Sequence, residues 1–422
     1  MTPAARLQAA IEVLEAWAGG TEGLDRVLAR WGRASRYAGS KDRAAVADLA
    51  YDALRAPRSR QVRMGAGDPG PALADLAPRA VVLAGAGLAG AGLAGGVETL
   101  LRNDRHGPGP LTPDEKAALE AISASEATLG HDGLAPGVRF DMPDWLLDAF
   151  GEVPQQTALA LRARAPLDLR VNTLKTDRAA AAAALAAEGV VAVPGPLSPT
   201  CLRVEAGARG VARTRTYADG LVEIQDAASQ AAADFAGAEP GMTVVDLCAG
   251  GGGKTLALGA AMAGRGDLVA HDIDARRMVD LPPRAARAGL EVCAVDAEGL
   301  QAWEGRADLV FADAPCSGSG AWRRNPDARW RLTPARLSAL TATQDAIIDR
   351  ALGLLAPGGH LVFATCSFLP LEGPLRIDAA MARRPGLRLV DRGGDGGHFA
   401  TLPDPEGGDG FFAARLGNSR TG

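Results

Sequence analysis

The fold is decided by five apolar segments: MTVVDLCAG (242–250), DLVAHDID (267–274), EVCAVDA (291–297), DLVFADAP (308–315) and HLVFATCS (360–367). Helical stretches alternate with these segments along the chain. Because the segments are too apolar for one face to lie in water, they predict an α/β fold with a doubly wound parallel sheet. Ligands of such sheets bind beyond the carboxyl ends of the strands, and the unusual residues of this sequence lie at those ends.

Two smaller regions precede this sheet. Positions 7, 10, 11, 14 and 17 are apolar and share one helical face, which predicts an all-helical domain over 1–135. LDLRVNT (167–173) and VVAV (190–193) have strand character and flank an Ala-rich helical segment at 177–188, which predicts a small α+β unit over 136–225. The parallel sheet then occupies 226–422.

Composition excludes several classes of protein. The chain has 422 residues, of which 47% are apolar, so it can bury a core in each domain. Its net charge of −5 gives no global positive field, and any nucleic acid must bind a local patch. The N-terminus lacks a signal-peptide core, which predicts a cytoplasmic protein. The uncharged stretch 80–97 contains too few strongly apolar residues for a membrane span and predicts a buried helical segment.

The segment DLCAGGGGKT (246–255) ends the first strand with four consecutive glycines, which let the backbone approach a ligand. A P-loop would need glycine at Cys248, and a dinucleotide fingerprint would need glycine at Thr255, so neither motif is present. Asp272 and Asp296 end the next two strands and suit ribose hydroxyls and an adenine amino group. The pattern indicates an adenosyl cofactor without phosphate recognition, although each aspartate is also a typical N-cap.

The five cysteines lie far apart and form no C-x-x-C pair, so the sequence predicts neither a disulfide framework nor a metal site. Cys316 and Cys366 follow two different strands and are expected at the same edge of one sheet. That placement favours a chemical role for both thiols. Cys201 and Cys293 are interpreted as buried structural cysteines.

The motifs together resemble the RsmB/NOP2/Sun family of RNA cytosine-C5 methyltransferases. The resemblance covers most of the chain and is carried, in the family's order, by RVN (170–172), VEIQDAASQ (222–230), DLCAGGGGKT (246–255), HDID (271–274), DAPCSGSG (313–320), RRNPDARW (323–330), TCS (365–367) and DGFFAARL (409–416). The segment GSKDRAAVADLAYDALR (39–55) is similar to the NusB-type domain of the bacterial RsmB branch. That branch implies ribosomal RNA, 16S in particular, as the substrate.

The resemblance implies S-adenosylmethionine as the cofactor, 5-methylcytosine as the product, and a role for each thiol. Cys366 would add to C6 of cytosine and make C5 nucleophilic. Asp313 would hold the N3/N4 edge of the flipped base, and Cys316 would help to remove the C5 proton and release Cys366. The implied cofactor contacts are Cys248, Ala249, Gly250, Gly251, Gly252, Gly253, Lys254, Asp272, Asp296 and Asp313.

Contacts to RNA are predicted at Arg170 and Asn172 of the RVN motif and at Arg323, Arg324 and Trp330 beside the active-site loop. For the second group, a solvated charged face with tucked tryptophans is an equally good interpretation. Two other functions stay open: the same chemistry on transfer RNA, and a catalytically idle RNA-binding or ribosome assembly factor. The expected partner is RNA, with no membrane association, and the protein is expected to be a monomer.

Two departures from the family pattern bear on activity. Gly250-Gly251 replaces the usual Ala-Pro, which predicts a more flexible cofactor loop. After Ser367 the family's Pro-Glu-Glu-Asn reads Pro370-Leu371-Glu372-Gly373, which predicts the loss of a helix-capping or loop-fixing contact.

Overall fold

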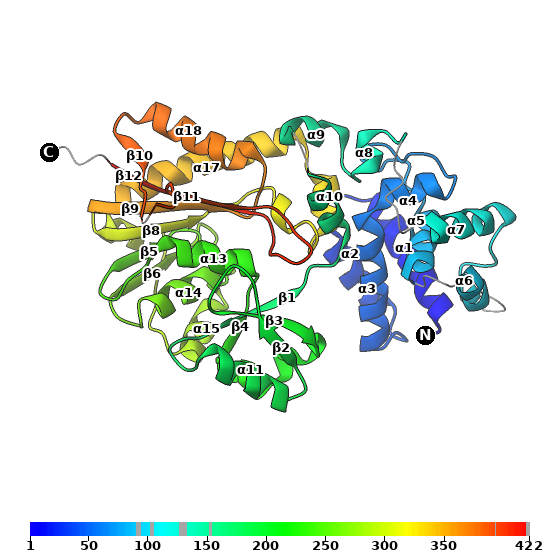
Figure 1. The fold of residues 1–422 in the computed structure, drawn as a ribbon, viewed down its shortest axis with the longest axis horizontal. Coiled ribbons are helices and arrows are strands. Elements are labelled where there is room, and N and C mark those ends of the chain that lie inside the picture. Colours follow the sequence, from blue (N-terminus) through cyan, green and yellow to red (C-terminus); the bar gives the residue numbers. More distant parts are fainter. Residues whose placement is uncertain (90–93, 102–104, 126–132, 152–153, 393, 419–422) are drawn as a thin grey trace. The chain divides into compact units, whose positions relative to one another are not determined.

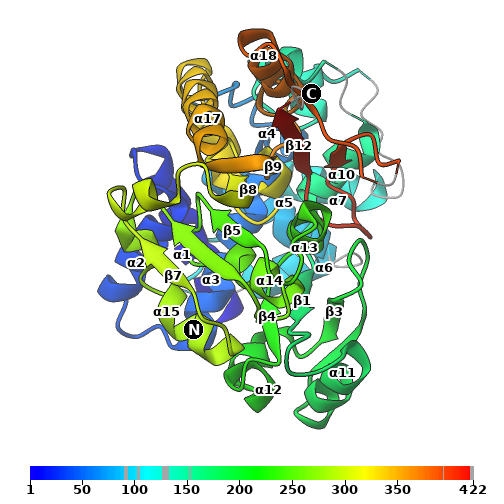
Figure 2. The same cartoon turned by 90° about the vertical axis from the view of Figure 1, so that its left-hand side faces the viewer.

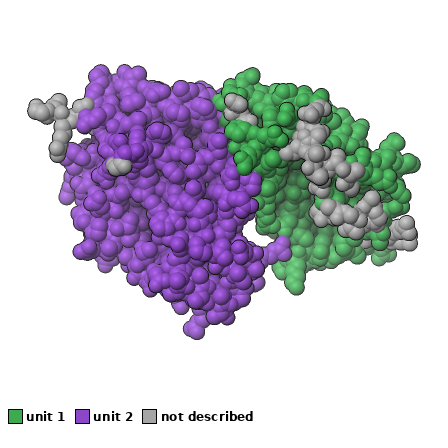
Figure 3. Space-filling view, in the orientation of Figure 1, with its two compact units in different colours: residues 1–164, 322–332 green, residues 165–321, 333–422 purple. Residues whose placement is uncertain are grey.

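The computed structural model describes the whole chain except residues 90–93, 102–104, 126–132, 152–153, 393 and 419–422. The chain divides into two compact units, shown in different colours in Figure 3. Unit 1 contains residues 1–164 and 322–332, and unit 2 contains residues 165–321 and 333–422. The active-site motifs of the sequence all lie in unit 2, apart from the RRNPDARW segment.

Unit 1 is helical in its described part, as predicted. Its helices are α1 (Pro3–Ala18), α2 (Leu24–Ala34), α3 (Ser40–Arg55), α4 (Pro57–Arg63), α5 (Pro78–Ala89), α6 (Ala94–Leu101), α7 (Pro113–Ser125), α8 (Pro136–Arg139), α9 (Asp144–Phe150), α10 (Gln155–Arg162) and α16 (Pro326–Arg331). Thr2 caps α1 by accepting a hydrogen bond from the amide of Ala5. The predicted apolar face of α1 is buried in the core of the unit, with Leu7, Ile11 and Leu14 at most 4% exposed.

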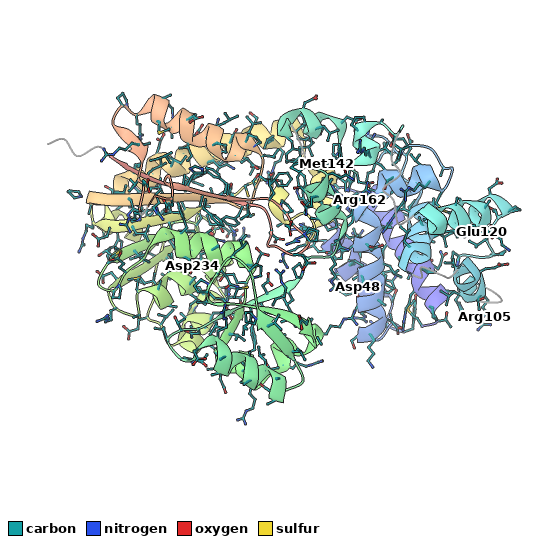
Figure 4. The ribbon with its side chains drawn as sticks, viewed as in Figure 1. Asp48, Arg105, Glu120, Met142, Arg162 and Asp234 are labelled. Atoms are coloured by element: carbon teal, nitrogen blue, oxygen red, sulfur yellow. The ribbon has the colours of Figure 1, made fainter. Side chains whose placement is uncertain are left out.

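Residues 136–162 belong to the helical unit, so the compact units divide at 164/165, later in the chain than the predicted domain boundary at 135. The guanidinium of Arg58 on α4 donates to the carbonyl of Met142 (2.7 Å) and to Asp144 (2.8 Å). Arg162 on α10 pairs with the fully buried carboxylate of Asp141 at 2.6 Å. Met142 and Arg162 are labelled in Figure 4. These polar contacts connect residues 136–162 to α4 and to one another.

The uncharged stretch 80–97 lies in α5 and α6, apart from residues 90–93, which are outside the described part. Val81, Val82 and Leu83 are at most 2% exposed in the core of unit 1, so the predicted buried helical segment is confirmed for α5. Among the residues that the structure describes, no helix is long and apolar enough to cross a membrane.

The segment 322–332 leaves the sheet-forming part of the chain and packs inside unit 1. The indole of Trp330 donates to the carbonyl of Leu54 at 2.9 Å, and the guanidinium of Arg329 donates to the carbonyl of Arg55 at 2.9 Å. Asp327 accepts a hydrogen bond from the amide of Leu24 at 2.9 Å. Segment 322–332 is therefore a structural part of the helical unit.

Replacing Trp330 by alanine is expected to lower the free energy of unfolding by about 3–5 kcal/mol, because a 6% exposed indole and its hydrogen bond are both lost. Tyr37 is 72% exposed in the same unit, and Tyr37→Ala is expected to change stability by about 0.5 kcal/mol or less. Urea denaturation of both variants measures the difference. Equal effects of the two substitutions would contradict the structural role of Trp330.

Unit 2 begins with a small antiparallel sheet in the order β2-β3-β1-β4. Its elements are β1 (Leu167–Val171), α11 (Arg178–Ala187), β2 (Val191–Pro194), β3 (Cys201–Ala206), η1 (Ala208–Arg213), α12 (Arg215–Ala218) and β4 (Val222–Ile224). The predicted α+β character is confirmed, and Asp177 caps α11 through the amide of Ala180 at 2.8 Å. Strand β3 was not predicted from the sequence.

The large sheet follows the order β10-β12-β9-β8-β5-β6-β7, with β11 paired to β12. Its strands are β5 (Thr243–Asp246), β6 (Asp267–His271), β7 (Cys293–Val295), β8 (Ala307–Asp313), β9 (Leu355–Thr365), β10 (Leu387–Leu389), β11 (His398–Thr401) and β12 (Phe411–Asn418). The five predicted strands, β5 to β9, pair in parallel, and the C-terminal strand β12 joins β9 antiparallel. The doubly wound sheet is confirmed.

Helices cover both faces of this sheet, as Figures 1 and 2 show for α13 and α14 on one face and α17 and α18 on the other. Neighbouring strand residues fall into different clusters: Val244 packs with α13 and α14, and Val245 packs with α17 and α18. The connecting helices are α13 (Ala227–Ala236), α14 (Gly253–Ala261), η2 (Ala275–Met278), α15 (Leu281–Ala288), η3 (Gly299–Trp303), η4 (Ser319–Ala321), α17 (Pro334–Leu354), η5 (Pro370–Glu372) and α18 (Pro374–Arg383).

Candidate active site

The chain crosses from β5 outward to β6 and β7, and then returns to the other side of β5 with β8 and β9. This reversal places a topological switch point between β5 and β8, where open α/β sheets bind ligands. The four-glycine loop leaves β5 at this point, and the loops that carry Cys316 and Cys366 leave β8 and β9 beside it. Parallel pairing thus brings the predicted site residues to one edge.

The glycine loop has a conformation that only glycine adopts freely. Gly250 and Gly252 have φ of 51° and 85°, and a Cβ on Gly252 would lie 2.3 Å from Cδ1 of Leu281. Gly252 is also the N-cap residue of α14. The loop therefore presents bare backbone at the start of a helix, as a ligand cradle requires.

Two arginines, the buried Arg170 and the half-buried Arg284, donate hydrogen bonds to the backbone of this loop. Arg170 donates to the carbonyl of Gly253 and to the side chain of Gln225, each at 2.6 Å, and Arg284 donates to the carbonyl of Gly251. Burial lowers the pKa of Arg170 to about 10, so it is still charged at neutral pH. The expected looseness of the Gly250-Gly251 departure is thus countered by contacts to the loop backbone.

Arg170 and Asn172, which are predicted to contact RNA, make interior contacts in the structure. Arg170 is 6% exposed and supports the glycine loop, as described above. Asn172 is 7% exposed, and its side-chain amide donates to the carbonyls of Gly220 and Ala288 at 2.9 Å each. The motif that contains them therefore connects the small sheet to the cofactor side of the large sheet.

The two strand-end carboxylates differ in their surroundings. Asp272 accepts the amide of Gly250 at 3.0 Å and pairs with Arg277 at 3.0 Å, so it lies directly beside the glycine loop. Asp296 accepts the amide of Gly299, the first residue of η3, at 2.8 Å, although the N-cap position of η3 is Glu298. Ile273 follows Asp272 and is 95% exposed, an apolar platform that sequence reasoning missed. The sequence signal that could have identified Ile273 is an apolar residue between Asp272 and Asp274 at the end of a strand.

The thiols of Cys316 and Cys366 lie 3.4 Å apart, sulfur to sulfur. The loops that carry them are joined by backbone hydrogen bonds from Ala314 to Ala364 (2.8 Å) and from Gly320 to the carbonyl of Cys366 (3.1 Å). Both cysteines are free and partly exposed. The predicted meeting of two thiols at one sheet edge is confirmed.

The surroundings of Cys316 disfavour its thiolate. The hydrogen bond to Cys366, together with burial, raises the pKa of Cys316 well above its usual value. Cys316 therefore keeps its proton at neutral pH. A thiol that keeps its proton is a poor nucleophile, so Cys316 is poorly suited to attack the ring.

Asp313 at the end of β8 forms an ion pair with Lys254 of the glycine loop, with the ammonium nitrogen 2.6 Å from Oδ2. Burial disfavours the charged form of Lys254, but the Asp313 carboxylate outweighs this and raises the pKa of the lysine. The same ammonium lies 5.0 Å from the ring centroid of Phe411 on β12. Lys254 thus connects the cofactor loop to the predicted base-binding carboxylate, a role that the sequence did not reveal.

Asp246 at the end of β5 is fully buried, and burial raises its pKa to about 7 despite a 2.7 Å hydrogen bond from Thr255. The folded protein keeps a proton that the unfolded chain loses near pH 4. Stability should therefore fall as pH rises from about 4 to 7, by about 1.4 kcal/mol per pH unit from this group. Asp246→Asn is expected to remove that slope. Urea denaturation of the wild type and of Asp246→Asn at pH 5 and pH 7 measures this pH dependence. The same change in the free energy of unfolding in both proteins would refute the raised pKa of Asp246.

Of the remaining cysteines, Cys248 lies in the glycine loop, where burial raises its pKa above the usual range. Cys201 is fully buried, as expected. Cys293 is exposed on β7, so its interpretation as a buried cysteine was wrong. Strand β7 lies at the edge of the large sheet, and Cys293 belongs to neither of the two core clusters that cover the faces of this sheet.

Two of the predicted RNA contacts beside the active-site loop are buried. Arg323 and Trp330 are 0% and 6% exposed, which for Trp330 matches the alternative of tucked tryptophans. Arg324 is exposed and stays a candidate. The run RRNPDARW combines four charged residues with one aromatic residue, and the backbone carbonyls of α3 accept hydrogen bonds from Arg329 and Trp330 within it.

The structure also shows the contacts of the segment after Ser367, where Leu371 and Gly373 differ from the family pattern. The carboxylate of Glu372 accepts hydrogen bonds from Ser317 in the Cys316 loop, so a loop-fixing contact is present after all. At position 373 a Cβ would lie 3.0 Å from Cγ of Phe412, and glycine relieves that crowding.

Comparisons with known proteins agree with this geometry. The family described as "16S rRNA methyltransferase RsmB/F" matches residues 237–417, and the "Methyltr_RsmF/B-like, ferredoxin-like domain" matches residues 142–209. The ribosomal RNA small subunit methyltransferases B of Salmonella arizonae and Salmonella newport are 33% and 34% identical over 71% of this chain and 71% of their own lengths.

Solved structures share the fold. The crystal structure of PH0851 superposes with a TM-score of 0.70 at 24% identity and covers 99% of both chains. A methyltransferase homolog from Pyrococcus horikoshii has a TM-score of 0.56 at 24% identity and covers 67% of this chain and 99% of its own. From the curated relatives and the family matches together, the chain belongs to the RsmB/F family of S-adenosylmethionine-dependent 16S rRNA methyltransferases.

Proposed function

We propose that this enzyme forms 5-methylcytosine in 16S ribosomal RNA through a covalent adduct between Cys366 and C6 of the target cytosine. The observation that carries the proposal is the pair of thiols, 3.4 Å apart, at the sheet edge that also holds Asp313 and Lys254. A single thiol would suffice for adding to the ring. Two thiols in contact suit a reaction in which one thiol forms the covalent adduct and the other helps to release the product from it.

The glycine loop fits the adenosyl cofactor. The bare backbone of Gly250 and Gly252, Asp272 beside it and the exposed Ile273 together offer a cradle, a polar anchor for a ribose and an apolar surface for a purine. When bound, S-adenosylmethionine supplies an electrophilic methyl group. The residues proposed to hold it are Cys248, Ala249, Gly250, Gly251, Gly252, Gly253, Lys254, Asp272, Ile273, Asp296 and Asp313.

Four side chains of the protein are proposed to have separate roles in the reaction. The Cys366 thiolate forms a bond to C6, which moves electron density onto C5 and N3 of the ring. Asp313 accepts a hydrogen bond from the exocyclic amine, and the nearby ammonium of Lys254 stabilises the charge that develops at N3. After methylation a base removes the C5 proton, the bond from Cys366 to C6 breaks, and the electron pair returns to sulfur. We assign help with that proton transfer to Cys316.

Bisulfite sequencing of ribosomal and transfer RNA from a deletion strain, compared with the parent strain, tests the substrate. Loss of one or more 5-methylcytosines from 16S RNA is expected, and restoration by the wild-type gene completes the experiment. Loss confined to transfer RNA would contradict the ribosomal assignment. Unchanged RNA, with no methyl transfer from labelled cofactor in vitro, would favour the assembly-factor alternative.

The helical unit is proposed to be NusB-like, and the enzyme is proposed to act as a cytoplasmic monomer. The relatives named above act on ribosomal RNA, which supports the cytoplasmic location. Sedimentation equilibrium of the purified protein tests the monomer directly.

A further inference from the structure

We infer that Glu372 is a positioning residue that holds the Cys316 loop against the Cys366 loop and thereby sets the distance between the two thiols. The inference rests on the proposed function for its catalytic meaning, but its geometric content can be tested independently. Glu372 follows β9 by a few residues and is fully buried. Among the described residues, Glu372 makes no hydrogen bond to either sulfur, and its charge contributes to the raised pKa of Cys316.

The carboxylate of Glu372 faces the Cys316 loop. Its Oε1 accepts the amide of Ser317 at 2.8 Å and the side-chain amide of Gln344 on α17 at 3.1 Å, and its Oε2 accepts the hydroxyl of Ser317. Its own carbonyl accepts the hydroxyl of Thr365 at 3.1 Å. Ser317 directly follows Cys316, and Thr365 directly precedes Cys366, so Glu372 bridges the neighbours of both thiols.

Two more serines complete a latch, which we define as Ser317, Ser319, Ser367 and Glu372. The hydroxyls of Ser319 and Ser367 lie 2.9 Å apart, and Ser319 also accepts the amide of Phe368 at 3.0 Å. All four latch residues are at most 9% exposed. Buried polar networks of this kind define one arrangement of a loop, because any other arrangement leaves polar groups without partners.

The latch requires a carboxylate at position 372. The amide and the hydroxyl of Ser317 both donate, so both oxygens of the side chain must accept. Glutamine has the same size but offers one oxygen and one NH₂ donor. In Glu372→Gln the remaining oxygen can still accept the amide of Ser317, but the Ser317 hydroxyl must turn and accept from the NH₂ group, so a charge-assisted hydrogen bond becomes a neutral one. The hold on Ser317 is weakened, while the volume of the core is unchanged.

The Cys316 loop is the side expected to move when this hold weakens. Cys366 directly follows β9, whose end pairs with β12 through Thr365 and Phe412. The Cys316 loop has no strand of its own after Asp313. Its displacement should slow release of the adduct more than its formation, because formation depends on Cys366 and release on Cys316.

The first experiment measures thiol distance without any substrate. Diamide oxidises the two thiols to a disulfide and is itself reduced to the hydrazine by the two electrons and two protons that they lose. The rate of Cys316–Cys366 disulfide formation, followed by alkylation and mass spectrometry, should be at least tenfold lower in Glu372→Gln than in the wild type. Asp378→Asn, which removes an exposed carboxylate on α18, is the matched control and should oxidise like the wild type.

The second experiment measures the catalytic consequence with the full chain and its RNA. Glu372→Gln should lower kcat by about 10–100-fold and change KM for RNA by threefold or less, because displacing a reacting group by about 1 Å costs about that much. The steady-state fraction of covalent protein–RNA adduct should rise. A lower kcat without more adduct, or with a proportional rise in KM, would refute the assigned role.

Ser317→Ala provides a second variant in case Glu372→Gln fails to fold. It removes one hydroxyl and keeps the amide contact, so its disulfide rate should fall about threefold. Wild-type oxidation rates in both folded variants would overturn the inference, whatever the reaction of the enzyme. Slow oxidation in the variants, with no 5-methylcytosine made by the wild type, would instead refute the proposed function and leave the positioning role of Glu372 supported.

Discussion

Replacing Cys316 by alanine is expected to convert most of the enzyme into a covalent protein–RNA adduct during turnover. The Cys366 thiolate still adds to C6, and methyl transfer still proceeds. The thiol 3.4 Å away, which helps the C5 proton to leave, is missing. The bond from Cys366 to C6 then breaks slowly. Denaturing gel electrophoresis with labelled RNA measures the adduct directly.

Replacing Cys366 by alanine should have the opposite result. Without the nucleophile no adduct forms, and methyl transfer should fall by about 10⁴-fold or more. The variant that lacks both thiols should behave like Cys366→Ala alone, because without Cys366 no adduct forms that Cys316 could help to release. Cys293→Ala removes an exposed thiol outside the site and should match the wild type. Adduct in both single variants, or in neither, would refute the assignment of the two thiols.

The parallel sheet could be predicted because its strands are buried on both faces. Val244 and Val245 pack on opposite sides of β5, as do Leu309 and Val310 of β8, so the segments are continuously apolar and stand out from their surroundings. The catalytic candidates could be predicted for the same reason. Polar residues that directly follow such strands must lie at one edge.

Two arginines that were predicted to contact RNA show what this reasoning could not reach. The local pattern around Arg170 and Arg323 does not tell whether their side chains are exposed. The structure buries both. The partners of Arg170 are the carbonyl of Gly253 and the side-chain oxygen of Gln225, which lie far away along the chain. Local periodicity contains no information on such acceptors.

Lys254 was predicted only as one of several residues in a cofactor loop. Its distinct role depends on the parallel pairing of β5 with β8, which brings the start of α14 next to Asp313. Lys254 and Asp313 are 59 residues apart in the sequence, so no local pattern indicates their contact. This ion pair could be found only after the strand order was known.

Removing either member of the Lys254–Asp313 pair is expected to lower single-turnover methyl transfer by about 10²–10⁴-fold. Asp313→Asn keeps the size of the side chain but removes the carboxylate proposed to hold the exocyclic amine. Lys254→Met keeps the length of the side chain but removes the ammonium proposed to stabilise charge at N3. It also leaves Asp313 without its cation, 2.6 Å away, in a part-buried site. Transfer of a labelled methyl group to RNA measures both variants.

The double variant decides whether the two residues act as one unit. If Lys254 acts through the charge it shares with Asp313, the double variant should lose no more activity than the worse single variant, because the second substitution removes a group already without its partner. Losses that multiply would show that the two residues act independently and would contradict a joint role of the ion pair. Lys175→Met is the matched control, since it removes the same charge from an exposed lysine of the same unit. Its activity should stay within about twofold of the wild type, because the ammonium of Lys175 donates to the backbone carbonyl of Asp219 instead of the site.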